Sequence, residues 1–359
     1  MSAPAFLLAA GFGTRLRPLT LHRPKPLVPF MGRPLLDQAI ALLLAHGIQD
    51  VVVNAHYLAD AVEDWAAQHN ASHHKASHHK ASHHGAEARV RLIVSREEPD
   101  ILGTGGGLRK VMDQLADPFV VVNGDILCDV DLGALLAATP EGGAAMALRT
   151  LRDGEAYGVV QHDGARVVDL VGLAAAAPQG PVDRGTHFTG VHAMSRAALS
   201  LVPPEGEACV VRTAYIALVP DRQVAALKHR GLWVDLGDPA AYLKAHLLAL
   251  EGAITPAQDN WPLAGLAVDA GGVSYGSPAL IDQHPDSELR HPVWLGQGAR
   301  IEPGAVVGPR VVVGDGAVIE AGVRLEDAVV WDGVTVPSGT SLLGGVVHDG
   351  GVLSIPGVK

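Results

Sequence analysis

The sequence has few cysteines, a deficit of basic residues and no long hydrophobic run. Cys128 and Cys209 are the only cysteines among 359 residues and form no CxxC pair, which indicates a reducing compartment and no disulfide framework. The formal net charge of −11 argues against nucleic acid as the main partner, because phosphate-backbone binding needs a basic face. No apolar run approaches a membrane span, and the N-terminus lacks signal-peptide features. We expect a cytoplasmic protein that binds neither nucleic acid nor membrane.

Short apolar runs alternate with longer amphipathic stretches over the first 250 residues. They predict strands at 6–10, 51–55, 90–94 and 119–123 and helices at 35–46, 58–68, 108–115 and 239–250. This alternation is typical of an α/β fold with a doubly wound, mainly parallel sheet, here over residues 1–251. Ligands of such sheets collect at the carboxyl ends of the strands, where Gly11 and Gly13 follow the first predicted strand.

The last seventy residues follow a six-residue apolar period. One column contains Leu295, Ile301, Val307, Val313, Ile319 and Leu325, and a second contains Val293, Ala299, Ala305, Val311, Ala317, Val323 and Val329. This period fits a hexapeptide-repeat parallel β-helix, in which each short strand sends a side chain into a shared interior. We expect this β-helix over 291–359, a phase slip after Val330, an irregular cap near Val336 and Leu342, and a linker or ill-formed first coil over 252–290.

Residues 71–85 repeat a five-residue unit, "ASHHKASHHKASHHG". Six histidines could bind zinc or nickel. A spacing of five does not stack the histidines on one helical face, so an exposed, dispensable loop insertion in the first domain is the favoured interpretation.

A glycine-rich turn and a cluster of cations stand near the start of the chain, in "LLAAGFGTRLRPLTLHRPKPLVP" at 7–29. The turn is not a dinucleotide fingerprint, because Leu16 replaces the third glycine, and no Walker GxxxxGK motif occurs. Arg15, Arg17, Arg23 and Lys25 follow the turn, and prolines stiffen the segment that carries Lys25. Backbone amides at the glycines together with these cations predict a phosphate site.

The same stretch resembles the signature of nucleotide-sugar pyrophosphorylases, which join a nucleoside triphosphate to a sugar 1-phosphate and release pyrophosphate. Further motifs follow in the family's order: "EEPDILGTGGGL" (97–108), "VVVNGDIL" (120–127), "AYGVV" (156–160) and "GLWVDLGDPAAYL" (231–243). The resemblance implies a Rossmann-like nucleotidyltransferase domain, and the C-terminal repeat is similar to the left-handed β-helix of mannose-1-phosphate guanylyltransferases. We expect the β-helix to be an oligomerisation or regulatory module, with a homo-oligomer that assembles through it.

The resemblance also implies roles for particular residues. Arg15 would bind the β- and γ-phosphates, Lys25 the α-phosphate and the sugar phosphate, and Asp125 and Asp235 would ligate Mg²⁺, whose hard character suits carboxylates. A sugar phosphate is already ionised at neutral pH, so in-line attack requires positioning and charge neutralisation more than a base. Nucleotide-binding positions would be Leu8, Ala9, Ala10, Gly11, Gly13, Thr14, Glu98, Gly103 and Thr104. Sugar-phosphate-binding positions would be Tyr157, Gly158, Thr189 and Gly190.

The chain departs from the family pattern on the sugar side. Members often carry Glu-Lys-Pro after the strand that follows "YGVV", whereas this chain reads "VVDLVGLAAAAP", so Arg184 or Arg212 is expected to supply the missing cation. In this respect the chain resembles pyrophosphorylases similar to muramate-1-phosphate uridylyltransferases.

Three other functions remain as alternatives. The DxD at Asp129 to Asp131 could belong to a glycosyltransferase, but that reaction gives the phosphate-site cations no task. A non-catalytic regulatory subunit would lack phosphate or metal ligands, which are present here. An acetyltransferase site in the β-helix would need more coils and a catalytic histidine.

The nucleobase is predicted from the acidic residues before the glycine run. In the family that the chain resembles, the residues just before the glycine run face the nucleobase. The resemblance therefore implies that Glu97 and Glu98 would face the base and that the missing side chain of Gly103 would let the base lie against the main chain. Guanine presents two adjacent donors, which a carboxylate can accept, whereas it would repel the carbonyl oxygens of uracil or thymine. We therefore expect GTP with a mannose 1-phosphate-like partner. The alternative is a uridylyl- or thymidylyltransferase acting on glucose 1-phosphate or an N-acetylated sugar 1-phosphate.

Overall fold

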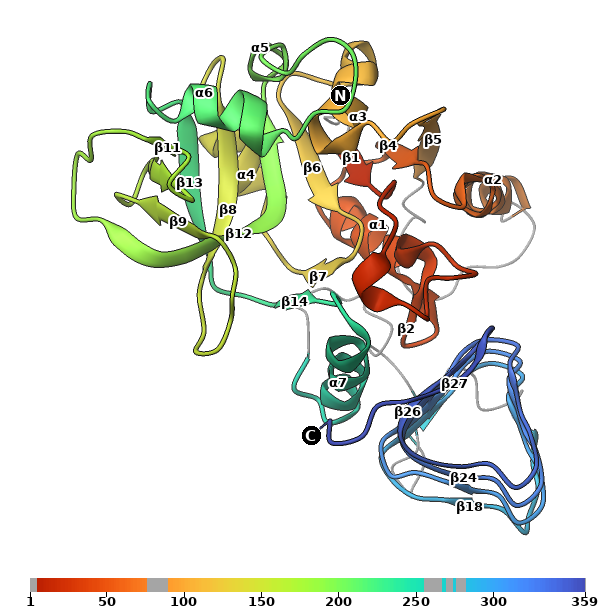
Figure 1. The fold of residues 1–359 in the computed structure, drawn as a ribbon. Helices are drawn as coiled ribbons and strands as arrows, with labels where there is room; N and C mark the ends of the chain where they lie inside the picture. Colours follow the sequence, from red (N-terminus) through yellow and green to blue (C-terminus); the bar gives the residue numbers. More distant parts are fainter. Residues whose placement is uncertain (1–4, 76–89, 255–266, 269–273, 276–281, 359) are drawn as a thin grey trace. The chain divides into compact units, whose positions relative to one another are not determined.

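The computed structural model describes residues 5–75, 90–254, 267–268, 274–275 and 282–358 (Figure 1). Internal contacts divide the chain into two units. Unit 1 comprises Met1–Phe12 and Ala39–Trp233, and unit 2 comprises Gly13–Gln38 and Val234–Lys359. The cation-rich segment that follows the glycine turn therefore belongs to the same unit as the C-terminal residues.

Unit 1 is built on a mainly parallel sheet, as expected from the alternating pattern. Its parallel part has the order β6-β1-β4-β5, formed by Phe119–Asn123, Ala5–Leu8, Asp50–Ala55 and Arg91–Arg96. These strands consist largely of buried Val, Leu and Phe, which suits strands covered on both faces. All four predicted strands are confirmed to within one or two residues.

An antiparallel extension continues the sheet beyond β6. Strand β12 (Asp183–Met194) pairs antiparallel with β6 and with β8 (Ala144–Thr150), which pairs in parallel with β13 (Val224–His229). Three shorter strands complete this edge: β9 (Val159–His162), β10 (Val167–Leu170) and β11 (Ala174–Ala175). An apolar core of unit 1 lies between this sheet and the helices on it, and includes Phe6, Phe119, Met146 and Tyr215.

The helices of the described residues are α1 (Leu35–Ala45), α2 (Ala59–Lys75), α3 (Gly103–Lys110), α4 (Leu132–Ala138), α5 (Arg196–Leu199), α6 (Ile216–Leu218) and α7 (Pro239–Leu250). Helix α7 begins at the predicted residue because the Asp238 side chain accepts from the amides of Ala240 and Ala241. No helix in the described part of the chain is long and apolar enough to cross a bilayer.

Two helix predictions require correction. The helix expected over 108–115 is instead α3, which starts in the glycine run and ends at Lys110. Helix α2 continues to Lys75, so the first five residues of the histidine repeat, 71–75, are helical rather than part of a loop. The remainder of the tract, 76–85, lies outside the described residues.

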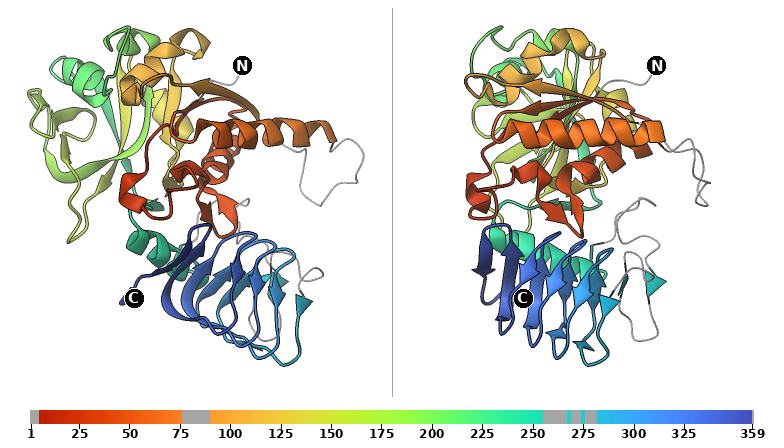
Figure 2. Two further views of the ribbon diagram at one scale, coloured as in Figure 1. Left: turned by 45° about the vertical axis from the view of Figure 1, so that its right-hand side comes forward. Right: turned by 90° about the vertical axis from the view of Figure 1, so that its right-hand side faces the viewer.

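The C-terminal part of unit 2 is a three-sided parallel β-helix whose coils stack along one axis (Figures 1 and 2). Its strands are β15 (Ala267–Val268), β16 (Ser274–Tyr275), β17 (Asp282–Gln283), β18 (Glu288–Leu289), β19 (Val293–Leu295), β20 (Arg300–Ile301), β21 (Val306–Val307), β22 (Val311–Val313), β23 (Val318–Ile319), β24 (Arg324–Val330), β25 (Thr335–Val336), β26 (Ser341–His348) and β27 (Gly351–Ser354). Both predicted columns are buried in its interior apart from Val329, whose place Ala328 takes.

The phase slip lies earlier than the sequence suggests. Val293 pairs with Val311, eighteen residues on, but Val311 pairs with Ala328, seventeen residues on, so the coil shortens by one residue before Val330. The interior continues with Val336, contrary to the expected irregular cap.

The expected linker forms the first coil, because β16, β17 and β18 pair in parallel with β19, β20 and β21. Backbone hydrogen bonds make this ladder, for example from the Glu288 amide to the Ala305 carbonyl at 2.8 Å, and they need no apolar period.

Strands β2 (Pro29–Phe30) and β3 (Arg33–Pro34) form a small hairpin in the N-terminal segment of unit 2. Met31 and Gly32 at its tip both have positive φ, as a tight two-residue turn requires. Strands β7 (Ile126–Cys128) and β14 (Trp233–Asp235) are short. Strand β7 begins directly after Asp125, and β14 ends at Asp235.

Candidate active site

The carboxyl ends of the parallel strands of unit 1 bring several predicted site residues together. The amide of Gly124, which follows β6, donates to the carbonyl of Leu8 at 2.9 Å, and the amide of Ala9 donates to Asn54 Oδ1 at 2.6 Å. The loop that carries Asp125 is thereby held beside the start of the glycine turn. Asp125 is half-buried at this edge of the sheet.

A buried polar network connects this edge to the glycine run. Asn54 Nδ2 donates to Glu97 Oε1 at 2.7 Å, and the Leu102 amide donates to Glu97 Oε2 at 2.7 Å. Glu97 is completely buried. Both of its oxygens are occupied by protein donors, so the prediction that Glu97 faces the nucleobase is wrong. Asn54 could not be recognised as its partner from the sequence, because the two residues meet only through the pairing of β4 with β5.

The glycines of α3 are required by close packing against neighbouring residues. A Cβ on Gly103, whose φ is +69°, would lie 2.8 Å from the Ala208 carbonyl oxygen, and one on Gly107 would lie 2.5 Å from Glu97 Oε1. The Gly105 amide donates to the same Ala208 carbonyl at 2.7 Å. The space beside Gly103 is therefore occupied by main chain, which corrects the expectation that its missing side chain makes room for a base.

Thr104 faces the same segment, since its hydroxyl accepts from the amide of Val210 at 3.0 Å. Its role and that of Gly103 in nucleotide binding remain predictions.

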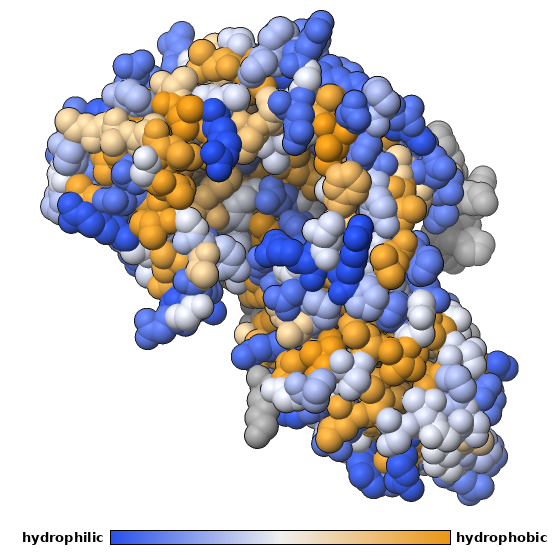
Figure 3. All heavy atoms as spheres, viewed as in Figure 1, coloured by the Kyte–Doolittle hydropathy of each residue, from blue (hydrophilic) through white to orange (hydrophobic). Residues whose placement is uncertain are grey.

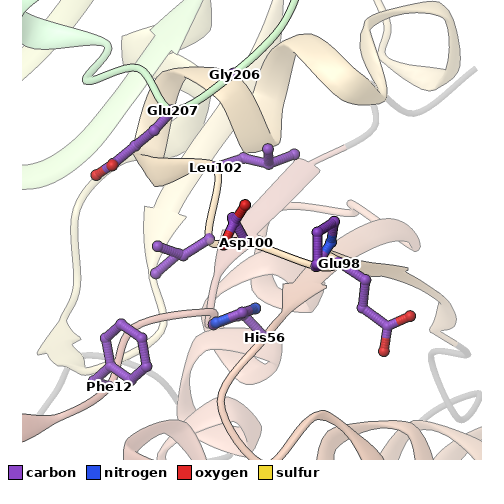
Figure 4. Close-up of a pocket in the computed structure, with 9 residues that line it drawn as sticks. Phe12, His56, Glu98, Asp100, Leu102, Gly206 and Glu207 are labelled. Carbon is purple, nitrogen blue, oxygen red and sulfur yellow. The ribbon is translucent and has the colours of Figure 1, made fainter.

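A pocket of about 450 Å³ lies next to this network in unit 1 (Figure 4). Its walls come from the glycine turn, the end of β4, the segment before α3 and the loop before Ala208: Phe12, His56, Glu98, Pro99, Asp100, Ile101, Leu102, Gly206 and Glu207. The rings of Phe12 and His56 meet edge to face, with centroids 5.5 Å apart. His56 Nδ1 lies 2.9 Å from the Glu97 carbonyl, so Nδ1 carries a proton and Nε2 is the acceptor in the neutral ring.

Glu98 lines this pocket but points away from Phe12 and Leu102 in Figure 4. Its carboxylate pairs with the Arg96 guanidinium, which also contacts Asp60 and Glu63. The side chain is 62% exposed. Phe12 and His56 therefore supply the aromatic surface of the pocket, which the sequence did not indicate because they lie on separate loops.

Two of the four predicted sugar-phosphate residues, Tyr157 and Thr189, contact Trp233 in unit 1. The Trp233 indole donates to the carbonyl of Thr189 at 2.8 Å, and its ring meets Tyr157 edge to face at 5.4 Å. Tyr157 also stacks on His187 at 4.6 Å. Gly190, with φ +82°, has no room for a side chain because a Cβ would lie 2.6 Å from Asn123 Nδ2. Gly158 is exposed and faces Val171.

Arg149 is the cation beside this aromatic cluster. Its guanidinium lies over the Trp233 ring at 4.7 Å, donates to His187 Nε2 at 3.1 Å and pairs with both oxygens of Glu155. The side chain is only 6% exposed. Arg184 and Arg212, the cations expected from the sequence, are exposed. Arg149 was missed because it stands eight residues before the "YGVV" motif, at the end of β8.

The N-terminal segment of unit 2, Gly13–Gln38, is called the signature segment below, and it folds tightly around Lys25. Gly13 has φ +60°, and a Cβ there would lie 2.9 Å from the Cβ of Lys25. The Thr20 hydroxyl donates to the Gly13 carbonyl at 2.8 Å and closes the turn. Lys25 is 7% exposed and begins a short 3₁₀ helix, Lys25–Leu27. The glycine at 13 is thus needed both for its backbone conformation and for the approach of Lys25.

Arg15 and Asp235 lie together in unit 2. Arg15 Nη1 is 4.0 Å from Asp235 Oδ2, and the Arg15 side chain is 69% exposed whereas that of Asp235 is 14% exposed. Gly237 allows this approach, since a Cβ there would lie 3.0 Å from Arg15 Nη1. Two of the four predicted catalytic residues, far apart in sequence, are therefore neighbours. Gly11, Thr14 and Arg17 are exposed and Ala10 is buried, and the phosphate-binding role of this turn stays a prediction.

Arg23 does not share this arrangement. Its guanidinium contacts Asp332 and Asp349 of the β-helix, so it is not part of a phosphate site.

The DxD motif has a different use in unit 1. Asp131 is the N-cap of α4 and accepts from the Ala134 amide at 2.9 Å, while Asp129 lies 3.3 Å from His229 Nε2. A capping aspartate and one packed against a histidine do not form a metal-binding pair. Across the residues that the structure describes, no three or more His, Cys, Asp or Glu side chains are grouped to hold a metal.

Comparison with known proteins agrees with these features. The family model described as "Nucleotidyl transferase" matches residues 4–252, and that described as "GMPPB C-terminal domain" matches 289–352. The solved structure of HddC from Yersinia pseudotuberculosis has a TM-score of 0.52 at 22% identity and covers 68% of this chain and 97% of its own, which shows the shared fold.

Among curated proteins, a putative mannose-1-phosphate guanyltransferase of Sulfolobus acidocaldarius is 28% identical, over 68% of this chain and 62% of that protein. The chain thus spans less than two thirds of that relative. A mannose-1-phosphate guanylyltransferase of Mycobacterium tuberculosis is 30% identical, over 84% of this chain and 77% of its own length. With a matching family model over well above half its length, the chain belongs to the nucleotidyl transferase family.

Proposed function

We propose that the protein transfers a nucleotidyl group from a nucleoside triphosphate to a sugar 1-phosphate. An oxygen of the sugar phosphate attacks the α-phosphorus, the bond between that phosphorus and the oxygen bridging to the β-phosphate breaks, and pyrophosphate leaves. The products are a nucleoside diphosphate sugar and pyrophosphate, so phosphorus and charge balance without an enzyme nucleophile.

The neighbouring Arg15 and Asp235 are the observation that carries this proposal. A solvent-exposed guanidinium beside a mostly buried carboxylate offers two opposite charges at one place. The guanidinium can bind phosphate oxygens and stabilise the departing pyrophosphate, because its planar fork matches a phosphate group. Lys25, held against Gly13, is proposed to contact the α-phosphate and the sugar phosphate.

We propose Mg²⁺ as the cofactor, held by Asp125 and Asp235. Asp125 follows β6 and Asp235 is the last residue of β14, and hard oxygen donors such as these carboxylates suit this ion. Two carboxylates are enough, since Mg²⁺ in nucleotide sites commonly keeps waters and takes its other ligands from phosphates. When bound, the ion would neutralise charge that develops on the phosphates.

GTP and mannose 1-phosphate are the proposed substrates. Support comes from the relatives above, whose names specify mannose-1-phosphate guanylyl transfer. In unit 1 the pocket beside Phe12 and His56 is wide enough for a nucleobase, and an aromatic edge is a suitable surface for one. We propose that Tyr157, Trp233 and Arg149 contribute to the sugar side.

A homo-oligomer formed through the β-helix is also part of the proposal. Where Figure 1 labels β26 and β27, Figure 3 shows apolar residues at the surface of unit 2. Leu343 is 66% exposed and Val352 is 51% exposed. Sedimentation equilibrium of the wild type and of Leu343→Glu measures this: oligomer lost only in the variant supports it, and a monomeric wild type rejects it.

The test of the reaction is pyrophosphate release from a panel of GTP, UTP, dTTP and ATP with mannose, glucose and N-acetylated sugar 1-phosphates. We expect release that depends on Mg²⁺, on GTP and on mannose 1-phosphate. A clear preference for UTP or dTTP would reject the guanylyl assignment while keeping the reaction class. No release with any pair would reject the class itself.

A further inference from the structure

Arg23 joins the signature segment to the last coils of the β-helix within unit 2. Its Nε and Nη2 atoms donate to Oδ2 and Oδ1 of Asp349, both at 3.1 Å, which is a bidentate pair. Nη1 donates to Asp332 Oδ2 at 3.3 Å. The guanidinium also lies over the ring of Trp331, 4.7 Å from its centroid. At 23% exposure this arginine is held by three residues rather than solvated.

The seventeen-residue coil makes this contact possible. With eighteen residues per coil, position 331 would follow Leu325 in the inward column. The coil loses one residue before Val330, so Val330 turns inward and Trp331 turns outward, as a one-residue slip reverses the faces of a strand. Trp331 is nevertheless 1% exposed. The irregularity of the repeat thus builds the surface that receives Arg23.

Further contacts fix the segment on the other side of Lys25. The Trp331 indole donates to the Tyr242 hydroxyl at 3.0 Å, and that hydroxyl donates to the carbonyl of Pro29. A Cβ on Gly32 would lie 2.3 Å from Trp294 Cη2, so the tip of the β2–β3 hairpin rests against the β-helix.

Lys25 lies between these attachment points on a stiff piece of chain. Pro24 and Pro26 flank it, and the amides of Leu27 and Val28 bond back to the carbonyls of Pro24 and Lys25 at 2.9 and 3.1 Å. A displacement at Arg23 or at Pro29 would therefore move Lys25 itself.

We propose that Arg23 is a positioning residue: held by Trp331, Asp332 and Asp349, it fixes the backbone that places Lys25, so the last coils of the β-helix contribute to nucleotidyl transfer. This rests on the proposed function for its effect on turnover, but not for its effect on the segment. Burial raises the pKa of Asp332 above its usual range and Arg23 opposes this shift, which marks the pair as partly withdrawn from water.

Arg310 offers a matched control in the same unit. It pairs bidentately with Asp327, through Nε and Nη2 at 2.6 Å each, and with Glu251 at 3.1 Å, and its side chain is 31% exposed. Arg310→Ala removes the same kinds of interaction from the β-helix and the end of α7. It leaves the contacts of the signature segment in place.

The experiment compares Arg23→Ala, Arg23→Lys and Arg310→Ala by thermal unfolding, amide hydrogen exchange and steady-state kinetics. In Arg23→Ala the amides of Leu27 and Val28 should exchange about tenfold faster or more, as expected from losing charge-assisted hydrogen bonds. Its kcat should fall roughly 10- to 100-fold with a smaller change in KM, because a misplaced Lys25 stabilises the transition state less, while binding of the ground state changes little. Arg23→Lys should recover part of both losses, since it keeps the charge but not the fork.

Arg310→Ala should keep the exchange rates and kcat of the wild type even if its Tm falls as far. The proposal is overturned if Arg23→Ala exchanges at Leu27 and Val28 like Arg310→Ala, or if faster exchange leaves kcat unchanged. If the wild type releases no pyrophosphate with any substrate pair, the proposed function fails. The exchange rates then still decide whether Arg23 orders the segment.

Discussion

Replacing Glu97 with glutamine should destabilise unit 1 without a direct effect on base recognition. The carboxylate accepts from Asn54 Nδ2 and from the Leu102 amide, each at 2.7 Å, with no exposure to solvent. A glutamine turns one of the two oxygens into an NH₂ group that must face one of these donors. Asn54 cannot flip to help, because its Oδ1 already accepts from the Ala9 amide at 2.6 Å.

The size of the loss follows from these contacts. One hydrogen bond to a charged group is lost, which costs about 1.5–3 kcal/mol, and a buried donor is left unpaired, so we expect about 2–4 kcal/mol in total. At roughly 2–4 °C per kcal/mol for a domain of this size, the Tm should fall by about 5–15 °C. Glu98→Gln is the control. Its exposed side chain should change the free energy of unfolding by about 0.5 kcal/mol or less.

Thermal unfolding by circular dichroism measures both variants in parallel, and nucleotide preference is assayed on each. A Tm of Glu97→Gln equal to that of the wild type would refute the network argument. So would a Glu97→Gln protein of normal stability that had lost its preference among bases, since that is the result of a base-reading carboxylate.

Three further predictions follow from other parts of the chain. Asp125→Asn and Asp235→Asn should each abolish pyrophosphate release while leaving the circular dichroism spectrum unchanged; near-normal kcat in either would exclude that residue as a metal ligand. Burial lowers the pKa of His246 to about 4, whereas a histidine in the unfolded chain takes up its proton near pH 6.5. The free energy of unfolding should therefore decrease by about 1.4 kcal/mol per pH unit as the pH falls from about 6.5 to about 4. His246→Gln should flatten the dependence of Tm on pH, and an unchanged slope would show that the histidine does not contribute. Gly32→Ala should cost about 1–3 kcal/mol because of its φ of +73° and the contact with Trp294, and an unchanged denaturation midpoint would contradict that packing.

Periodicity made the regular elements predictable. A continuous apolar run is a local feature of the sequence, and it predicted the strands at 51–55 and 119–123. A capping aspartate is local too, and it marks the start of the helix at 239–250. Both β-helix columns were predictable up to Leu325, because a six-residue apolar repeat predicts which side chain of each short strand faces the interior. The resemblance placed Arg15 and Asp235 in one function, and they are neighbours.

The other features depend on contacts between distant residues, which a single sequence does not display. Helix α3 starts in a run of poor helix formers because the Ala208 carbonyl accepts from the amides of Gly105 and Gly106 in its first turn. The shortened coil before Val330 leaves the apolar composition unchanged and only alters which residues face inward. Arg23 stands among phosphate-site cations, and nothing local distinguishes it from them. Its true partners, Asp332 and Asp349, are more than three hundred residues away in sequence.

The proposed function requires that phosphate bonds are exchanged between a nucleoside triphosphate and a sugar 1-phosphate. Phosphorus NMR of one reaction containing GTP, mannose 1-phosphate, Mg²⁺ and the wild-type protein follows every species at once. We expect the sugar 1-phosphate signal to disappear as a nucleoside diphosphate sugar and inorganic pyrophosphate appear in equal amounts. Omitting the sugar 1-phosphate should stop all change. Conversion of GTP to GMP and pyrophosphate without the sugar 1-phosphate would contradict the proposed function. So would unchanged spectra when the same experiment is repeated with GTP, UTP, dTTP and ATP and with each sugar 1-phosphate of the panel.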